Sequence, residues 1–474
     1  MASELNLLEV RLGSVEAPAG CGKTELIAST LRRCQSADKP VLVLTHTNAG
    51  ANALQQRLVK HGISPAIYRL FTIDGWAMRM VAAFPAGSGY QLQTGGWSLD
   101  YPAIRRGAAH LLASGNIDPL LAATYSRLIV DEYQDCSIEQ HAVVLGISKT
   151  LPTVVLGDPL QAIFGFKGNV LVDWSDVESE FPDVGQLDKP WRWINAGAQP
   201  LGEWLIEIRK NLKAGGAVDL LKGHPGVNWV QVEGEKDVQG RMAAAAYKHP
   251  DGDGSLLIIA EGSDKVGQQN FAKRTPGAST LEAVDLKDLT GFATSYKPGS
   301  AGCLDQLLEF GASVMTKVDP DGLRTRLKAL SGTRAKKEAT VAERAAQAYV
   351  AQPTLDAAHR LLRALGKNPG ARAYRPAIYY GALDALSNVA DSGKSFAEAA
   401  ISVRELQRHK VRVFPKRAVG STLLLKGLEA DVAVVMHPEK MTATHLYVAL
   451  TRGARKVLVC SSKSELIPLK ANKA

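Results

Sequence analysis

Residues 17–24 read Ala-Pro-Ala-Gly-Cys-Gly-Lys-Thr, and this stretch decides the fold of the chain. A strand-like segment, residues 13–17, leads into it, and a helical pattern over residues 23–34 follows. Glycines let backbone N–H groups wrap around phosphates, and the helix N-terminus adds its positive end. In such a loop Lys23 reaches the β- and γ-phosphates and the Thr24 hydroxyl binds Mg²⁺. The stretch therefore predicts a phosphate-binding loop between a strand and a helix.

Short apolar runs continue this pattern along the first third of the chain. Residues 40–45 (PVLVLT), 127–132 (RLIVDE) and 153–158 (TVVLGD) have strand length, and two of them end in acidic residues. Strands that alternate with helices predict a parallel sheet with both faces covered. The Gly- and Ala-rich stretch at about 80–125 interrupts the pattern, so we predict a small insertion there.

A second α/β pattern follows residue 193. Strands are predicted at VNWVQV (227–232) and SLLIIA (255–260), and strands resume at STLLL (421–425), ADVAVVM (430–436) and KVLVCS (456–461). Only helical patterns occur between residues 303 and 410. We therefore predict three domains, which are a first α/β domain over residues 1–190, a second over 191–284 and 413–474, and a helical insertion over 285–412.

The composition is that of a globular protein, with 46% hydrophobic and 22% charged residues among 474. The five cysteines are scattered and form no CxxC pair, which favours reduced thiols and argues against a zinc or iron–sulfur site. The N-terminus does not resemble a signal peptide, and no apolar run approaches 18 residues. We therefore expect a cytoplasmic protein without a membrane partner.

Positive charge is concentrated in one segment. Residues 317–412 hold 18 Lys or Arg and 9 Asp or Glu, a surplus equal to the whole chain's net charge of +9. Two interpretations stay open. The segment is either a solvated helical surface or a surface that contacts a phosphate backbone.

Two adjacent carboxylates follow the apolar run at residues 127–130. In the motif DEYQD (131–135), Asp131 and Glu132 come at the end of a predicted strand of the sheet that carries the phosphate-binding loop. This position suits Asp131 to hold Mg²⁺ and Glu132 to orient and deprotonate an attacking water. The plainer alternative is an acidic loop after a strand.

Five motifs occur in a characteristic order: APAGCGKT, DEYQD, GDPLQAIFGFKG (157–168), KGLE (426–429) and YVALTR (447–452). The order and the gaps resemble the UvrD/Rep-type superfamily 1 DNA helicases. The resemblance implies an α/β fold of two RecA-like P-loop domains with parallel sheets and ATP bound between them. It also implies ATP and Mg²⁺ as cofactors, single-stranded DNA as partner, and movement in the 3′ to 5′ direction.

The resemblance assigns roles around the nucleotide. Gln161 would sense the γ-phosphate together with Arg192, Trp191 would lie against the adenine, Glu429 would contact the ribose, and Arg452 would act as an arginine finger. With Lys23, Asp131 and Glu132, the residues Gln161, Arg192 and Arg452 form the expected catalytic set. The remaining expected nucleotide contacts are Ala17, Gly20, Cys21, Gly22, Thr24 and Glu25. No glutamine precedes Ala17, so the family's usual adenine-reading motif is missing.

The resemblance also implies contacts with DNA. Phe164 and Phe166 would stack on bases, since aromatic faces bind any base at ~1–3 kcal/mol each. The other expected DNA contacts are Thr45, His46, Asn48, Thr72 and Lys426. Four positions depart from the family pattern: Lys167 replaces Arg, His46 replaces an aromatic residue, and Asp74 and Leu423 each replace His.

Alternatives to a helicase stay open. In size and layout the chain also resembles the compact helicase-like subunit of the Gabija antiphage system, which works with an ATPase–nuclease partner, so a DNA-sensing defence subunit competes with a repair helicase. A non-catalytic, nucleotide-gated DNA-binding protein would carry damaged motor residues, whereas Lys23, Thr24, Asp131, Glu132 and Arg452 are present. An RNA motor would be distinguished by comparing activation by single-stranded DNA and RNA.

Overall fold

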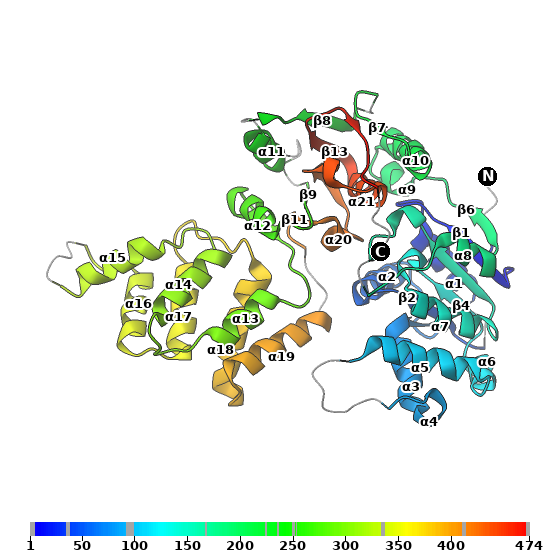
Figure 1. Ribbon diagram of the computed structural model, residues 1–474, viewed down its shortest axis with the longest axis horizontal. Coiled ribbons are helices and arrows are strands. Elements are labelled where there is room, and N and C mark those ends of the chain that lie inside the picture. Colours follow the sequence, from blue (N-terminus) through cyan, green and yellow to red (C-terminus); the bar gives the residue numbers. More distant parts are fainter. Residues whose placement is uncertain are drawn as a thin grey trace. The chain divides into compact units, whose positions relative to one another are not determined.

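The computed structural model describes residues 5–34, 38–91, 99–165, 168–222, 225–234, 237–248, 252, 254–332, 337–409 and 414–470. By its internal contacts the chain divides into two compact units, unit 1 (residues 1–229 and 438–474) and unit 2 (residues 230–437). The structure confirms the predicted α/β class, because it contains two six-stranded sheets and many helices (Figure 1). The predicted domain boundaries differ from this division and stay a prediction.

The first sheet, in unit 1, has the strand order β3-β2-β4-β5-β1-β6. Neighbouring strands are parallel throughout. Parallel strands end at the same edge, so the loops after β1, β4 and β5 meet there. The strands are β1 (Leu12–Glu16), β2 (Val41–Thr45), β3 (Tyr68–Thr72), β4 (Leu128–Val130), β5 (Thr153–Gly157) and β6 (Asp183–Gln186).

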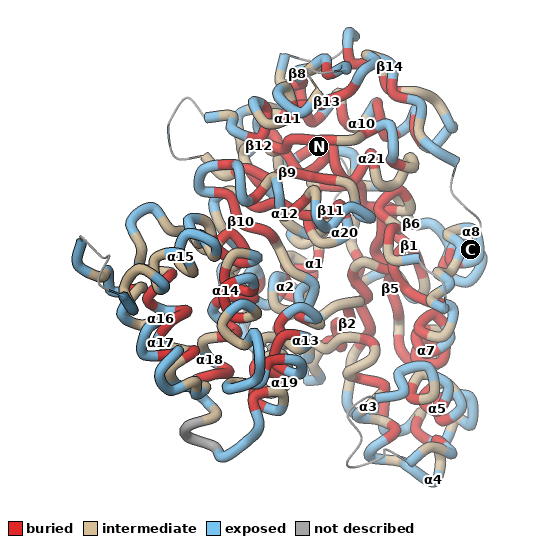
Figure 2. Tube along the Cα trace, turned by 60° about the vertical axis from the view of Figure 1, so that its left-hand side comes forward, coloured by how far each residue is buried: buried red, intermediate tan, exposed pale blue. Residues whose placement is uncertain are grey.

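Strands β2 and β5 of this sheet are buried on both faces, as their apolar runs predicted (Figure 2). Leu42 and Leu44 of β2 join one hydrophobic cluster, whereas Val41 and Val43 join the cluster on the opposite face. The alternation follows from the period of two in a β-strand. The first cluster includes residues of α3 (Ile73–Ala83), α5 (Tyr101–Ala113) and α7 (Ile138–Ser148), and the second includes residues of α1 (Lys23–Arg33) and α2 (Asn48–Lys60).

Eleven α-helices among the described residues belong to unit 1. They are α1 (Lys23–Arg33), α2 (Asn48–Lys60), α3 (Ile73–Ala83), α4 (Pro85–Ser88), α5 (Tyr101–Ala113), α6 (Asp118–Thr124), α7 (Ile138–Ser148), α8 (Trp174–Glu180), α9 (Trp191–Asn195), α10 (Gln199–Lys213) and α21 (Ala443–Leu450). The small insertion predicted near 80–125 corresponds to α4, α5 and α6. Its apolar side chains, such as Ile104 and Leu111, are buried in the same cluster as α3 and α7, so it extends the core.

The second sheet has the strand order β10-β11-β9-β12-β13-β8. The four strands of unit 2 pair in parallel. They are β9 (Leu256–Ala260), β10 (Ala278–Thr280), β11 (Arg417–Ser421) and β12 (Ala430–Val435), and the other two strands are β8 (Val227–Gln231) and β13 (Gly453–Ser461). Unit 1 also holds an antiparallel pair, β7 (Val218–Asp219) and β14 (Glu465–Leu466).

The predicted all-helical insertion lies between β10 and β11 in unit 2. Its apolar faces share one core cluster, which contains Leu307, Tyr349, Leu361 and Ala382. It comprises α13 (Lys287–Ser295), α14 (Cys303–Val314), α15 (Pro320–Leu330), α16 (Val341–Ala351), α17 (Leu355–Gly366), α18 (Pro376–Ser392) and α19 (Phe396–His409). The remaining helices of unit 2 are α11 (Asp237–Ala245), α12 (Lys265–Arg274) and α20 (Thr422–Leu425).

One predicted strand was wrong. The run STLLL was expected to be extended, but β11 ends at Ser421 and residues 422–425 form α20. The Ser421 hydroxyl accepts a hydrogen bond from the Leu424 N–H and so caps the new helix. Across the part of the chain that the structure describes, no helix is both long and apolar enough to cross a bilayer.

Candidate nucleotide site

The loop between β1 and α1 has the backbone that a phosphate-binding loop needs. Gly20 and Gly22 have φ of 70° and 93°, values that favour glycine. Gly22 directly precedes α1, whose first residue is Lys23. The Ala17 N–H donates to the Gly157 carbonyl at 2.8 Å and so ties the loop to the end of β5.

Lys23 joins the two acidic residues that follow β4. Its Nζ lies 3.0 Å from Asp131 Oδ1 and 2.5 Å from Glu132 Oε1. Although burial alone would lower it, the carboxylates of Asp131 and Glu132 raise the pKa of Lys23 above its ordinary value. Burial raises the pKa of the Asp131 carboxyl, against the opposing effect of Lys23. The sheet thus brings together three residues, of which Lys23 lies more than 100 positions before the other two.

Glu132 has a strained backbone. Its φ is 57°, in the left-handed region that non-glycine residues rarely adopt, at a cost of about 1–3 kcal/mol. The Gln134 Nε2 donates to Glu132 Oε2 at 2.6 Å, while the other carboxylate oxygen accepts from Lys23. The Glu132 side chain remains 31% exposed. A carboxylate held from two sides but open to solvent is suited to contact a water molecule.

Asp158, at the end of β5, connects two glutamines. Its N–H donates to Gln134 Oε1 at 3.0 Å, and its Oδ2 accepts from Gln161 Nε2 at 3.0 Å. Asp158 is fully buried. Gln134 therefore bridges Glu132 to Asp158, and Asp158 in turn orients Gln161, which sequence resemblance placed against the γ-phosphate.

A buried arginine from α10 completes this network. Arg209 Nε and Nη2 lie 3.1 and 2.8 Å from Asp158 Oδ1, and Nη2 also lies 2.5 Å from Glu16 Oε1. Lys213 Nζ donates to both oxygens of Glu16, at 3.1 and 2.9 Å. Arg209 is 2% exposed, so its buried positive charge must be compensated by the carboxylates of Asp158 and Glu16.

Helix α9 packs against the phosphate-binding loop. The Arg192 N–H donates to the Gly20 carbonyl at 3.0 Å, and Arg192 Nη1 donates to the Thr451 carbonyl at 2.8 Å. A Cβ atom added to Gly20 would lie 2.7 Å from the Trp193 ring. Trp191 is 42% exposed, and Lys189 Nζ lies 3.8 Å from the centroid of its ring in a cation–π contact. Its expected contact with adenine stays a prediction.

The predicted arginine finger, Arg452, is 2% exposed and lies in unit 1. Its Nε donates to the Val448 carbonyl at 2.9 Å, and its Nη2 donates to Thr451 Oγ1 at 3.1 Å. These contacts hold the guanidinium against the C-terminal end of the preceding helix, α21. From the same helix, the buried Tyr447 hydroxyl accepts the Ala19 N–H at 3.2 Å. Helix α21 therefore contacts the phosphate-binding loop through Tyr447.

Thr24 and Asp131 supply the oxygens expected to hold Mg²⁺. The Thr24 hydroxyl accepts a hydrogen bond from Arg57 Nη1 at 3.0 Å. Mg²⁺ typically takes one or two protein oxygens and completes its shell with phosphate and water, so this donor set fits the ion. Within the described ranges, no cluster of three or more His, Cys, Asp or Glu side chains could hold a metal by itself. The neighbouring Glu25 carboxylate lies 3.1 Å from His61 Nε2.

The expected DNA contacts are only partly accessible. His46 and Phe164 lie side by side, with ring centroids 5.2 Å apart, and Asn48 is exposed at the start of α2. Thr45 is completely buried at the end of β2, so its side chain is not accessible to DNA in this structure. Thr72 is half-buried and caps α3 by accepting the Gly75 N–H. Phe166 and its neighbour Lys167 lie outside the described residues.

In unit 2, Lys426 is half-buried and Glu429 is exposed, on either side of Gly427 with its φ of 81°. They follow α20, the short helix that replaced a predicted strand. Their expected contacts with DNA and ribose stay predictions.

Asp74, where the family has histidine, is already paired. Arg105 Nε and Nη2 approach its two carboxylate oxygens at 2.7 Å each, and Gln140 Nε2 donates at 3.1 Å. The carboxylate therefore does not present an unbalanced negative charge beside a phosphate backbone. Arg105 comes from α5, so the insertion supplies the compensating charge.

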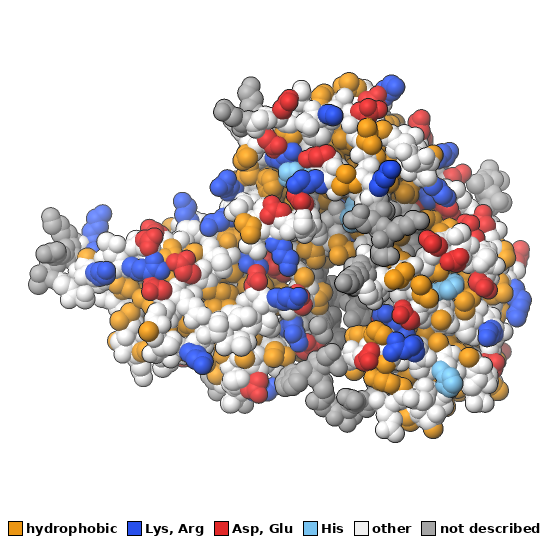
Figure 3. Space-filling view, in the orientation of Figure 1, with side chains coloured by type: hydrophobic (Ala, Val, Ile, Leu, Met, Phe, Trp, Pro, Cys, Tyr) orange, Lys and Arg blue, Asp and Glu red, His pale blue; other side chains and the backbone are white. Residues whose placement is uncertain are grey.

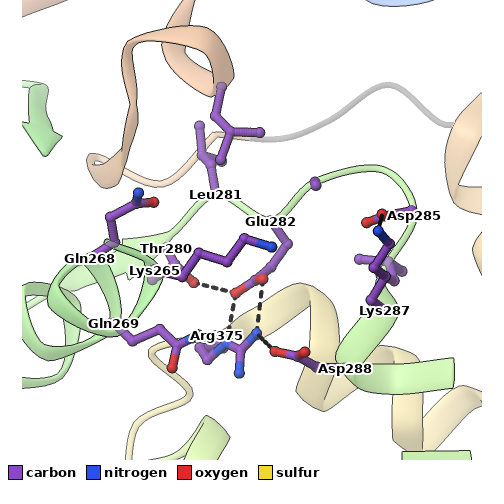
Figure 4. Close-up of a pocket in the computed structure, with 13 residues that line it drawn as sticks. Lys265, Gln268, Gln269, Thr280, Leu281, Glu282, Asp285, Lys287, Asp288 and Arg375 are labelled. Carbon is purple, nitrogen blue, oxygen red and sulfur yellow. Dashed lines mark hydrogen bonds and ion pairs between the residues drawn. The ribbon is translucent and has the colours of Figure 1, made fainter. Parts of the chain in front are cut away.

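A small pocket in unit 2 lies beside the ion cluster of Arg375, Glu282 and Asp288 (Figure 4). Arg375 is 4% exposed and donates to both oxygens of Glu282, at 2.8 and 3.0 Å, and to Asp288. The volume is about 70 Å³, far below the ~300 Å³ of a small-molecule site. Because the arginine is saturated by carboxylates, we interpret the cluster as the attachment of the helical insertion to its sheet.

Sequence reasoning missed several residues of the nucleotide site. Glu16, Gln134, Arg209 and Tyr447 were assigned no role. Tyr447 contacts the loop, Gln134 contacts Glu132, and Arg209 connects Glu16 to Asp158. A signal for Arg209 was present. It falls among the apolar positions Leu201, Leu205, Ile208 and Leu212 of one helix, where an arginine must find a buried partner.

Comparison with known proteins finds similarity over part of the chain. A model described as an AAA domain matches residues 5–167, which include the phosphate-binding loop, DEYQD and Gln161. A solved structure similar to this chain is the Pif1 helicase from Candida albicans, with 14% identity and a TM-score of 0.26. That similarity covers 52% of this chain and 53% of the helicase, about half the length of either protein. No curated protein sequence matches the chain.

Proposed function

We propose that this chain is a superfamily 1 helicase-like ATPase of the UvrD/Rep type, which hydrolyses ATP to move along single-stranded DNA. The observation that carries the proposal is the junction of Lys23, Asp131 and Glu132 at one edge of the first sheet, with contacts of 3.0 and 2.5 Å. The AAA domain match over residues 5–167 supports a nucleotide-hydrolysing role for the same residues.

The side chains have distinct tasks in this proposal. Bound MgATP would supply the phosphoryl group that is transferred to water, and the metal ion would offset the negative charge of the phosphates. Lys23 and the loop N–H groups hold the phosphates, and Thr24 and Asp131 hold the metal. Glu132 orients the attacking water and accepts its proton. Gln161, held by Asp158, senses the γ-phosphate. His46 and Phe164, whose ring centroids lie 5.2 Å apart, form the proposed DNA-binding surface.

The test is ATP hydrolysis with and without single-stranded DNA, with Glu132→Gln as the control. We expect DNA to stimulate wild-type turnover and Glu132→Gln to reduce kcat by about 10²–10⁴-fold, as for loss of a general base. The variant should still bind ATP because Lys23 and the loop are intact. Equal stimulation by RNA would show that the protein does not select DNA over RNA. The absence of stimulation by either polymer would overturn the proposal of a nucleic-acid motor.

Direction needs its own experiment. The motif order resembles 3′ to 5′ motors, so we expect the protein to displace streptavidin from the 5′ end of a biotinylated oligonucleotide and not from the 3′ end. Displacement from the 3′ end instead would support a DNA motor but contradict the 3′ to 5′ direction of the UvrD/Rep type. DNA binding without stimulated hydrolysis would instead favour the alternative of a sensing subunit that needs a nuclease partner.

A further inference from the structure

Arg209 stands out because it is a fully buried cation outside every motif of the nucleotide site. It comes from α10, beyond the segment that matches the AAA domain. We propose that Arg209 is a positioning residue that fixes Gln161 through Asp158 and thereby sets the preference for ATP over ADP. The inference rests on the proposed function, since it deepens the role of the same site.

The Asp158 carboxylate accepts hydrogen bonds from Arg209, from Gln161 and from the Leu160 N–H, which donates to Oδ1 at 3.2 Å. Arg209 Nε and Nη2 both donate to Oδ1, at 3.1 and 2.8 Å, whereas Gln161 Nε2 donates to Oδ2 at 3.0 Å. The planar guanidinium approaches with two N–H groups, so it fixes the plane of the carboxylate as well as its position. The orientation of the Gln161 amide therefore depends in part on Arg209, which adds two charged donors to the Leu160 N–H on the same carboxylate oxygen.

The charges around Arg209 also indicate that the position of Asp158 depends on this arginine. Glu16 and Asp158 are both buried and both contact Arg209 Nη2, at 2.5 and 2.8 Å. Without the guanidinium, Glu16 would rely on Lys213, and that side chain is 52% exposed. Two buried carboxylates that lose their shared cation must separate or bind a proton. Either response changes the position or charge of the Asp158 carboxylate, which accepts the hydrogen bond from Gln161.

The network also reaches the carboxylate expected to activate water. Asp158 donates its N–H to Gln134, and Gln134 donates to Glu132. However, the Gln134 contact uses the Asp158 backbone, which directly follows the β5 ladder. Loss of the Arg209 fork should therefore disturb Gln161 first and Glu132 much less.

The experiment compares Arg209→Met and Arg209→Lys in the wild-type and Gln161→Ala backgrounds. Calorimetry of the full-length protein gives the Kd and the stoichiometry for ADP and for a non-hydrolysable ATP analogue, so only folded molecules count. The matched control is Arg127→Met, because Arg127 is a buried arginine of the same unit that donates to the carbonyls of Leu7 and Leu8.

We expect Arg209→Met to reduce the preference for the triphosphate by about tenfold while the Kd for ADP changes less than about threefold. Arg209→Lys should recover part of the preference, because it keeps the charge without the fork. In the Gln161→Ala background, Arg209→Met should have no further effect, and Arg127→Met should leave the preference unchanged.

A parallel loss of ADP and ATP-analogue affinity would assign Arg209 a structural role only and overturn the inference, as would an undiminished effect in the Gln161→Ala background. The binding ratio requires no turnover, so it decides the inference even if wild-type hydrolysis fails the DNA-stimulation test. A wild-type protein without any triphosphate preference would also overturn it.

Discussion

Glu16 illustrates how single residues at the end of β1 respond to pH. Burial raises its pKa, but hydrogen bonds and charges from Lys213 and Arg209 outweigh burial and lower it below its ordinary value. A carboxyl with a lowered pKa stabilises the fold at pH values above its unfolded pKa, and this stabilisation is lost as pH falls through the folded pKa. The Glu16 contribution is therefore complete at neutral pH and disappears in acid.

We predict that Glu16→Gln lowers the unfolding free energy by about 1–3 kcal/mol at neutral pH. The difference from wild type should shrink as pH falls below about 4.5, the ordinary range of the carboxyl. Chemical denaturation followed between about pH 3 and pH 8, or melting temperature over the same range, measures it. Glu465→Gln, at an exposed strand position, is the control, and a pH-independent difference would contradict the assignment.

The Asp74–Arg105 pair provides a second prediction at this scale. Its side chains are only 20% and 14% exposed, and two contacts are 2.7 Å. We predict that Arg105→Met lowers the unfolding free energy by about 1–3 kcal/mol, because the carboxylate then depends on Gln140. Arg360→Met is the matched control. Its pair with Asp356 is 74% and 59% exposed, so less than about 0.5 kcal/mol is expected. Equal effects in urea titrations would refute the distinction.

The candidate site was predictable where residues follow parallel strands directly. Lys23, Asp131 and Glu132 each lie at a strand or helix boundary that the apolar runs identify, and parallel topology brings such ends to one edge. Arg209 was not predictable, because its partners are set by the packing of α10. For Thr45 the prediction was incomplete. The sequence placed it correctly at the end of a strand, but it did not reveal that the side chain is buried.

At the scale of elements, α9 packs directly against the phosphate-binding loop. Trp193 is 1% exposed, its Nε1 donates to the Gly453 carbonyl at 2.9 Å, and its ring leaves no room for a Cβ at Gly20. The loop therefore requires glycine at position 20 for two reasons, the φ of 70° and the contact with the tryptophan.

These two reasons can be separated with a matched pair of variants. Gly62 also has a φ of 70°, but no atom lies within 4 Å of its added Cβ. We predict that Gly62→Ala costs about 1–2 kcal/mol of stability, the backbone term alone, and leaves nucleotide affinity unchanged. Gly20→Ala should cost more and weaken ATP binding by at least about tenfold. Equal nucleotide affinities for the two variants would reject the contact with Trp193.

Element prediction failed where a local cap competed with an apolar run. STLLL has the composition of a strand, but Ser421 ends β11 and its hydroxyl caps α20. Serine before an apolar run permits either outcome, and the choice depends on β9, which pairs with β11 only as far as Ser421. The helices of the insertion raised no such conflict, because their helical periodicity extends over many residues.

At the scale of the whole molecule, the basic surplus of residues 317–412 acquires a physical interpretation. Arg324 pairs with Asp305, Glu309 and Asp321, and Arg326 pairs with Glu343. Figure 3 shows Lys and Arg mixed with Asp and Glu over the visible face of the helical insertion. For Arg324 and Arg326, this pairing favours the interpretation of a solvated surface. Other cations of the segment, namely Arg334, Lys336, Lys410 and Arg412, lie outside the described residues.

This interpretation predicts the salt dependence of DNA binding. Each phosphate that the protein neutralises on a single strand adds about 0.7 to the slope of log K against log salt. Lys328 and Lys367 belong to the insertion, and we predict that the double variant Lys328→Gln/Lys367→Gln keeps the wild-type slope, with the same Kd in low salt. Fluorescence anisotropy with a labelled oligonucleotide over a series of salt concentrations measures it. A slope smaller by about 1.4 would instead assign both lysines to the DNA backbone, because only direct phosphate neutralisation releases counterions in that proportion.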